Sequence, residues 1–153
     1  MDVYARLMEL GITLPDPPAR GGLYAPMKIA GNLVFVSGHV PSLDGKPIMT
    51  GKIGADLSVE QGQQAARQVA LNTLATLHSG LEDLNRIKSV VKLFGLVACA
   101  DDFTQQPAVI NAASQVFIDV FGDEGWHTRS AVGTNSLPGG VPVEIESIFE
   151  LKD

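Results

Sequence analysis

The segment HTRSAVGTNSLPGGVPVEIE, residues 127–146, contains two β-prone runs on either side of a turn. Ser130–Asn135 and Val141–Leu151 are predicted strands on either side of this turn. Leu137–Gly140, with the sequence LPGG, is typical of a hairpin loop. The segment therefore predicts that the chain ends in two adjacent antiparallel strands.

This hairpin predicts that Arg129 and Glu144 project from the same face of the sheet. Pairing outward from the loop sets Gly133 opposite Glu144, and Arg129 shares the strand parity of Gly133. Arg129 and Glu144 would lie about 13 Å apart at roughly 3.3 Å per residue, with room for a small molecule and a water. Guanidinium binds carboxylates, and glutamate can orient a water or carry its proton. From the residues alone, a surface ion pair is the simpler interpretation.

Upstream of this hairpin, hydrophobic periodicity and turn residues predict the remaining elements. Ser58, with Gln61 three residues later, forms a helix-starting capping box. In chain order we expect a short helix at Val3–Leu10, strands at Met27–Ala30 and Leu33–Ser37 around Gly31-Asn32, a turn-rich loop or irregular hairpin at Pro41–Gly54, a helix from Ser58 to about His78 stopped by Gly80, a strand at Ser89–Ala100, and a helix from Asp101-Asp102 to Phe121 stopped by Gly122.

The core order is thus β-β-α-β-α-β-β, an α+β domain with two helices packed on one face of a mixed sheet. Residues 1–20 are predicted as an N-terminal helix and connector, and residues 21–153 as the domain itself. Two helices leave the second sheet face uncovered. Because several strands are apolar on both faces, we expect that face to pack against another subunit.

Composition narrows the range of functions. The 153 residues are 45% hydrophobic and 18% charged, enough for one domain with a sizeable core. The net charge is −6 and the 11 basic residues are scattered, which argues against nucleic-acid and membrane-surface partners. A signal peptide and an apolar run of membrane-spanning length are both missing, so a cytoplasmic location is expected. The single cysteine, Cys99, is expected to be buried and inert.

Several motifs occur in the order seen in one known family. Arg129-Ser130-x-Val132, then Leu137-Pro138, then Val143-Glu144-Ile145-Glu146 resemble the signature of the RidA/YjgF family, with the same arginine-to-glutamate spacing. Further matches upstream are Gly22-x-Tyr24, Leu33–Gly38 followed by Pro41, the helix around Gln64–Leu77, Gly80-Leu81, Asp101–Phe103 and Asn111. The resemblance covers about residues 21–151.

The resemblance implies a fold similar to chorismate mutase and a homotrimer with pockets at the subunit clefts. Many members hydrolyse reactive 2-imino or enamine acids to 2-keto acids and ammonia, with no metal or organic cofactor. By resemblance, Arg129 would hold the substrate carboxylate and Glu144 would position the attacking water. Tyr24 would close the pocket from a neighbouring chain, while Ser37, Gly38 and Asn111 would shape it. A purely structural interpretation is also open for Tyr24, Ser37 and Asn111.

The chain departs from the family pattern around this pocket. Ala25-Pro26 follows Tyr24 where many members carry hydroxyl or amide side chains. Ala131 stands at the pocket wall where many have a cysteine, and Trp126-His127-Thr128 replaces a phenylalanine-proline lead-in. These changes keep the carboxylate clamp and the acid/base but alter the walls. Imine hydrolysis is therefore the leading hypothesis, and a non-catalytic protein that binds a small carboxylate is the alternative.

Other chemistry has weaker support. His39, His78 and His127 lie far apart in sequence, and no metal-binding spacing is present. His127 shares strand parity with Arg129, so it is a candidate second acid or base. RNA cleavage, also attached to this family, is disfavoured by the acidic balance. Serine triads and phosphate-binding loops have no matching motif.

Overall fold

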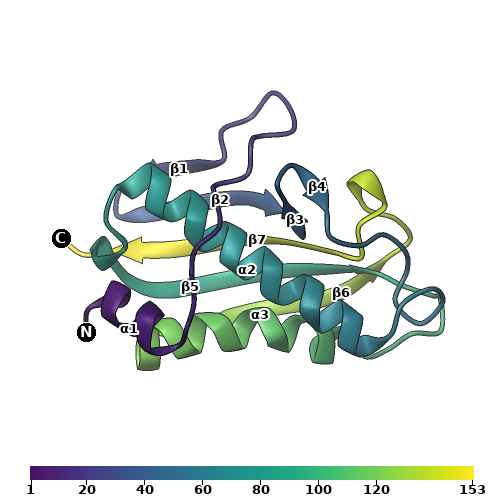
Figure 1. The fold of residues 1–153 in the computed structure, drawn as a ribbon. Helices are drawn as coiled ribbons and strands as arrows, with labels where there is room; N and C mark the ends of the chain where they lie inside the picture. Colours follow the sequence, from purple (N-terminus) through teal and green to yellow (C-terminus); the bar gives the residue numbers. More distant parts are fainter.

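Five strands form one mixed sheet in the order β1-β2-β7-β5-β6, and a separate two-stranded hairpin lies beside it (Figure 1). The computed structural model describes residues 1–153. The helices are α1 (Val3–Glu9), α2 (Val59–Leu81) and α3 (Gln106–Phe121), and the strands are β1 (Met27–Ala30), β2 (Leu33–His39), β3 (Ser42–Leu43), β4 (Lys46–Pro47), β5 (Ile87–Ala98), β6 (Thr128–Thr134) and β7 (Val143–Leu151). Three 3-10 turns are η1 (Leu84–Arg86), η2 (Gly122–Gly125) and η3 (Pro138–Gly140). The predicted α+β class is confirmed.

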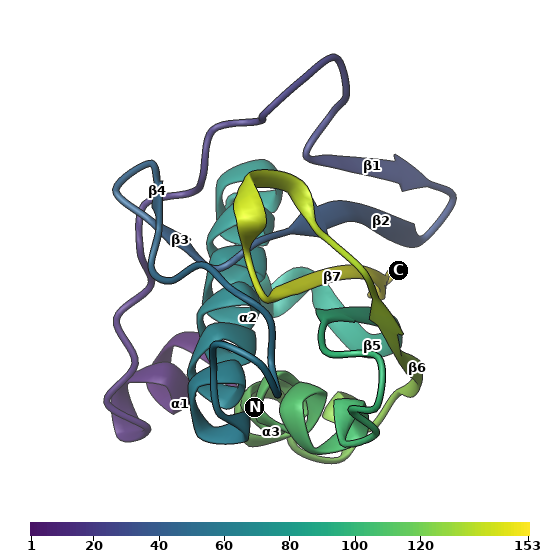
Figure 2. The ribbon, with the colours of Figure 1, turned by 90° about the vertical axis from the view of Figure 1, so that its right-hand side faces the viewer.

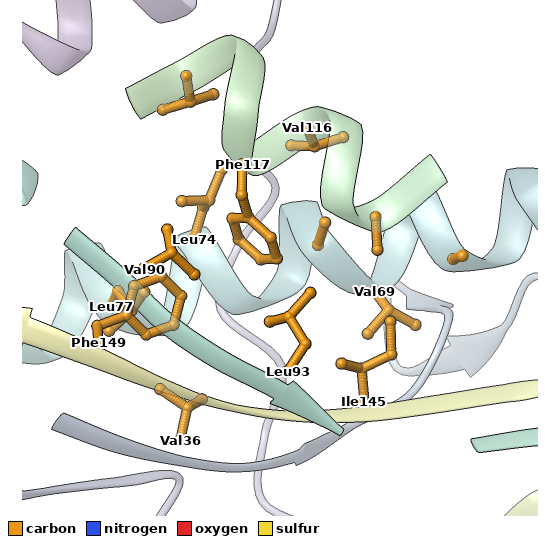
Figure 3. Close-up of a cluster of buried hydrophobic side chains, with 14 of the residues drawn as sticks. Val36, Val69, Leu74, Leu77, Val90, Leu93, Val116, Phe117, Ile145 and Phe149 are labelled. Carbon is orange, nitrogen blue, oxygen red and sulfur yellow. The ribbon is translucent and has the colours of Figure 1, made fainter. Parts of the chain in front are cut away.

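Helices α2 and α3 lie side by side on one face of the sheet (Figures 1 and 2), as predicted. The core fills the space between the two layers. Phe117 of α3 stands edge-on to Phe149 of β7, with ring centroids 5.6 Å apart, and Leu74 and Leu93 are fully buried beside them (Figure 3). Strand β7 alternates buried and partly exposed residues, the pattern of a strand with one face on a core.

Two of the four predicted ends of α2 and α3 are confirmed, and two are wrong. Ser58 and Gln61 form the predicted capping box at the start of α2. Gly80 does not stop α2, which runs on to Leu81; instead, the missing side chain at Gly80 lets Met27 pack against the helix. Helix α3 begins at Gln106 and not at Asp101, because Pro107 lacks a backbone N–H and is tolerated only in a first turn. Gly122 ends α3 as predicted.

The predicted hairpin between the last two strands is wrong. Strand β5 lies between β6 and β7, and Leu96 of β5 is paired with Val132 on one side and Glu144 on the other. Strand β6 runs parallel to β5, since α3 makes the crossover connection that two parallel strands require. Residues 135–142 therefore pass over the end of β5, where the Ala98 N–H donates to the Pro142 carbonyl at 2.9 Å.

The face of the sheet opposite the helices carries an apolar stripe. Phe35, Phe94, Leu96, Val132 and Ile148 share this face by strand register. Phe35 is 44% exposed and Val132 is 41% exposed. The expectation that the helices leave one face uncovered is confirmed, and its packing against another subunit stays a prediction.

The N-terminal helix α1, predicted at Val3–Leu10, is present and packs on the domain. Asp2 caps its first turn by accepting from the N–H groups of Tyr4 and Ala5. Val3 and Leu7 are buried and belong to the same hydrophobic cluster as the sheet and the long helices. The Pro41–Gly54 segment forms the short hairpin β3–β4 around Asp44-Gly45, both at positive φ. No helix of the chain is both long and apolar enough to cross a membrane.

Because Leu7 is 4% exposed and Met8 is 80% exposed on the same helix, the two residues test whether α1 stabilises the fold. We expect Leu7→Ala to lower the free energy of unfolding by about 2–4 kcal/mol, through lost burial and the cavity left behind. Met8→Ala, the matched control, should change it by less than about 0.5 kcal/mol. Urea unfolding at pH 7.5 measures both, and equal midpoints would show that α1 contributes nothing to stability.

Candidate functional site

Arg129 lies on the edge strand β6 and points toward α3. It pairs with Leu93, a fully buried core residue, so its side chain leaves the sheet on the helix-covered face. The guanidinium donates to Ser114 Oγ at 3.0 Å, to Asn111 Oδ1 at 2.7 Å and to the Pro107 carbonyl at 3.4 Å. Partial burial lowers the pKa of Arg129, but a guanidinium stays protonated in proteins. Helix α3 thus holds this cation at the edge of the sheet, with N–H donors to spare.

Glu144 lies on β7 and points to the opposite face. Its strand neighbours Val143 and Ile145 are buried in the core, so alternation turns Glu144 away from the helices. It lines a cavity of about 510 Å³ together with Tyr24, Ser37 and Gly38. Burial raises the pKa of Glu144 above its usual value, and the nearby carboxylate of Glu146 raises it further. A carboxyl of raised pKa is suited to give and take a proton near neutral pH.

Gly38 sits against the Glu144 carboxylate. A Cβ built on Gly38 would lie 2.9 Å from Glu144 Oε1, closer than a carbon and an oxygen normally approach. The register between β2 and β7 shifts between Val36 and His39, so the chain bulges at this point. His39 holds the bulge, since its Nδ1 lies 2.6 Å from the Ser37 carbonyl and its Nε2 lies 2.7 Å from Thr76 Oγ1 on α2.

The remaining wall comes from the loop before β1. Ser37 Oγ donates to the Ala25 carbonyl at 2.7 Å, and Tyr24 Oη accepts from the Gly21 N–H at 3.0 Å. Tyr24 is 43% exposed and lines the cavity of its own chain. Tyr24 therefore lies beside the Glu144 of its own chain, and its role in closing a pocket across a subunit boundary stays a prediction.

The predicted same-face arrangement of Arg129 and Glu144 is wrong. Arg129 is paired with Leu93 and Glu144 with Leu96, three residues further along β5, and these two positions face opposite sides. From strand spacing and rise, the two backbone positions are about 14 Å apart. The simpler alternative, an ion pair between them, is wrong too, because the ion pairs of the chain are Arg6–Glu9 and Lys88–Glu150.

The predicted site residues therefore divide into two groups. Asn111 contacts Arg129, and Ala131 shares its strand face; we call these three residues the arginine half. Tyr24, Ser37 and Gly38 line the Glu144 cavity; we call these four residues the glutamate half. The His, Cys, Asp and Glu side chains form no group of three or more that could hold a metal ion.

A sequence model of the family described as "YjgF/chorismate mutase-like, putative endoribonuclease" matches residues 4–143. The chain belongs to the YjgF family. Both halves of the candidate site, apart from Glu144 just beyond the match, lie within that region. The match begins within α1, so it extends beyond the part of the chain in which the sequence motifs occur.

Three relatives of this YjgF family member match nearly its whole length. Protein TCP17 of Trypanosoma cruzi is 42% identical over 99% of this chain and 95% of its own. The crystal structure of Atu1372 from Agrobacterium tumefaciens, of unknown function, is 43% identical with a TM-score of 0.90, over 98% of this chain and 92% of that one. A putative endoribonuclease from Shewanella oneidensis is 30% identical with a TM-score of 0.94, over 99% of this chain and all of that one.

Sequence reasoning missed several residues that support the site of this YjgF protein. Ser114 follows Asn111 by three residues, so helical spacing places both on one face of α3, a signal that was available. Glu146 follows Glu144 by two residues, so the two side chains lie on the same face of the strand. From this spacing one can predict that Glu146 raises the pKa of Glu144. His39 had no such signal, because its partner Thr76 lies on a different element.

The contact between Gly38 and Glu144 can be tested by adding one methyl group. We expect Gly38→Ala to displace the Glu144 carboxylate and to lower activity, or ligand binding in this cavity, by at least about tenfold. The backbone φ of Gly38 is not positive, so alanine adds no conformational strain of its own. Steady-state kinetics measure the loss and thermal unfolding serves as the control. A large drop in melting temperature would show a folding defect in place of a site defect.

Proposed function

We propose that this protein hydrolyses small, reactive 2-imino and enamine acids to 2-keto acids and ammonia, without a cofactor, in pockets shared between copies of a homotrimer. The observation that carries the proposal is the division of the site: a cation held for an anion on one face, and a carboxyl of raised pKa beside a cavity on the other. Neither half is a complete site for this chemistry. A second copy that brings its arginine half to this chain's glutamate half would complete one.

The chemistry assigns a role to each half. Arg129 binds the substrate carboxylate and leaves the imine carbon facing Glu144. Glu144 takes a proton from a water as the water oxygen bonds to the carbon of the protonated imine, which gives a neutral carbinolamine. The same carboxyl then returns the proton to nitrogen. The C–N bond breaks as the carbinolamine hydroxyl gives its proton to Glu144, and ammonia leaves with a 2-keto acid and carries this proton away as ammonium. Water supplies the oxygen and the protons, so the reaction needs no oxidant or reductant.

The open sheet face supports assembly from several copies. Its apolar stripe includes the exposed rings and chains of Phe35 and Val132, and exposed apolar surface of this kind is stabilised by burial against another protein. Arg129 lies on β6, the edge strand next to β5, and so at the border of that face. An interface along this border would place a neighbour's edge strand near the glutamate half.

We expect the protein to speed the release of ammonia and 2-oxobutanoate from enzymatically generated 2-iminobutanoate. Arg129→Ala should lower kcat/KM by about a hundredfold, the loss of charge-assisted hydrogen bonds to the substrate. Arg67→Ala, which removes an exposed arginine of α2, is the matched control and should leave the rate unchanged. Binding of 2-oxobutanoate without turnover would favour the alternative, a protein that only binds small carboxylates. Absence of both binding and turnover over several imino acids would refute the proposal.

Subunit complementation tests whether the pocket is shared. Arg129→Ala and Glu144→Gln should each have little activity alone, since each lacks one half. Copies of the two variants, unfolded together and refolded as mixed oligomers, should regain a measurable part of the activity, because some interfaces then carry both wild-type halves. Each variant refolded by itself is the control. Mixed oligomers, identified by mass spectrometry, that stay inactive would show that the two residues do not act across an interface.

A further inference from the structure

Ser114 connects Arg129 to a histidine that the proposed reaction does not use. Its hydroxyl oxygen lies 3.0 Å from Nη1 of Arg129 and 2.9 Å from Nε2 of His127. Ser114 is 8% exposed, so these contacts are shielded from solvent. The His127 ring also stands edge-on to Phe117, with centroids 6.4 Å apart, which restricts its rotation. The three polar side chains form one continuous hydrogen-bonded chain along α3 and β6.

The direction of each hydrogen bond in this chain follows from its ends. Nδ1 of His127 lies 2.6 Å from the Gly125 carbonyl, which can only accept, so Nδ1 carries the ring proton. Nε2 of the neutral ring then has a lone pair and accepts the Ser114 hydroxyl proton. This turns a lone pair of the Ser114 oxygen toward Arg129, whose Nη1 donates to it. Polarisation along such a chain strengthens each bond.

We propose that His127 and Ser114 are positioning residues that, with Asn111, hold the Arg129 guanidinium in the orientation needed to bind an anionic ligand. This inference rests on the proposed function only in taking that ligand to be a small carboxylate. Asn111 and Ser114, on successive turns of α3, accept hydrogen bonds from the two terminal nitrogens of the guanidinium. His127 fixes the direction of the Ser114 hydroxyl proton, so that a lone pair of the Ser114 oxygen faces Arg129.

The surroundings of His127 keep it in the neutral form that this chain requires. The groups that face the ring are Ser114 and Phe117 from α3, the Gly125 carbonyl from η2 and the cation of Arg129 from β6. Burial lowers the pKa of His127, and the charge of Arg129 lowers it further. Protonation would place an N–H donor at Nε2 against Ser114, which would then have to accept from two cations. On acidification we therefore expect ligand affinity to fall at a lower pH than the one at which an unperturbed histidine becomes protonated.

Beside the glutamate half lies a histidine with the same pair of contacts, but no arginine takes part in its hydrogen-bonded chain. His39 makes Nδ1 and Nε2 hydrogen bonds to the Ser37 carbonyl and to Thr76, and the Thr76 hydroxyl accepts from no cation. This comparison separates two roles. His39 fixes a backbone bulge, whereas the hydroxyl partner of His127 is itself bound to the charged residue that would contact the ligand.

The test measures the affinity for 2-oxobutanoate by calorimetry at pH 7.5. We expect Ser114→Ala to weaken binding about tenfold, as for the loss of one hydrogen bond to a charged group. His127→Phe, which keeps the packing on Phe117, should weaken binding about three- to tenfold. His127→Gln should restore most of the affinity, because its amide oxygen can accept from Ser114. In the Ser114→Ala background, His127→Phe should have no further effect, since the connection is already broken.

The matched control is His78→Phe, which removes a surface histidine whose Nδ1 lies 2.9 Å from Tyr4 Oη, and which should leave the affinity unchanged. A second readout needs no ligand. Nitrogen NMR should find the Nδ1–H tautomer at His127 in the wild type. In His127→Phe, the Nε–H group of Arg129 should become more mobile, which its NMR signal would report. An unaltered Arg129 signal together with unaltered affinity in His127→Phe would overturn the inference.

The failure of the inference can be told apart from the failure of the proposed function. Arg129→Ala that binds 2-oxobutanoate as well as the wild type would refute the role of Arg129, and with it the proposed function. Loss of binding in Arg129→Ala, with full binding in Ser114→Ala and His127→Phe, would refute the positioning roles alone. If the wild type does not bind 2-oxobutanoate at all, the mobility of Arg129 in His127→Phe decides the inference by itself.

Discussion

The pairing of β5 with two partners is the constraint on which the rest of this structure depends. Leu96 has Val132 on one side and Glu144 on the other, so β5 separates the two strands that carry the main charged candidates. From Lys92 to Val97, β5 has neighbours on both sides, which satisfy its backbone N–H and C=O groups. Its buried side chains, such as Leu93 and Val97, belong to the core, and α3 packs against this strand. An end-of-chain hairpin would have left β5 without one of these partners.

The same pairing determines where chemistry can occur. Side chains on a strand alternate between faces, so positions three apart along β5 point in opposite directions. Arg129 is therefore directed to α3, which supplies Asn111 and Ser114, and Glu144 is directed to a cavity on the other side. Within a single chain, the arginine half and the glutamate half lie on opposite sides of the sheet and cannot face one another. This geometry explains why the family's charge pair, although correctly spaced in sequence, is not an ion pair.

The two halves share a structural device. Beside each half lies a histidine whose Nδ1 contacts the carbonyl of the residue two positions earlier and whose Nε2 contacts a hydroxyl on a helix. This hydroxyl is Thr76 of α2 for His39 and Ser114 of α3 for His127. Burial lowers the pKa of both histidines, so both are neutral links between sheet and helix. One link shapes the bulge beside Glu144. The other lies behind Arg129, at a position where the sequence departs from the family pattern.

The sequence by itself determined the class of the fold, the β1–β2 and β3–β4 hairpins, the capping box of α2 and the end of α3 at Gly122, since these depend on local periodicity, caps and turn residues. The spacing of Arg129 and Glu144 also made these two residues the candidates for a site. Only the tertiary structure decided that β5 enters between β6 and β7, and with that the faces on which the two residues lie. The physical reason is that strand partners are chosen by hydrogen bonding and burial between segments far apart in the chain, which local patterns do not record.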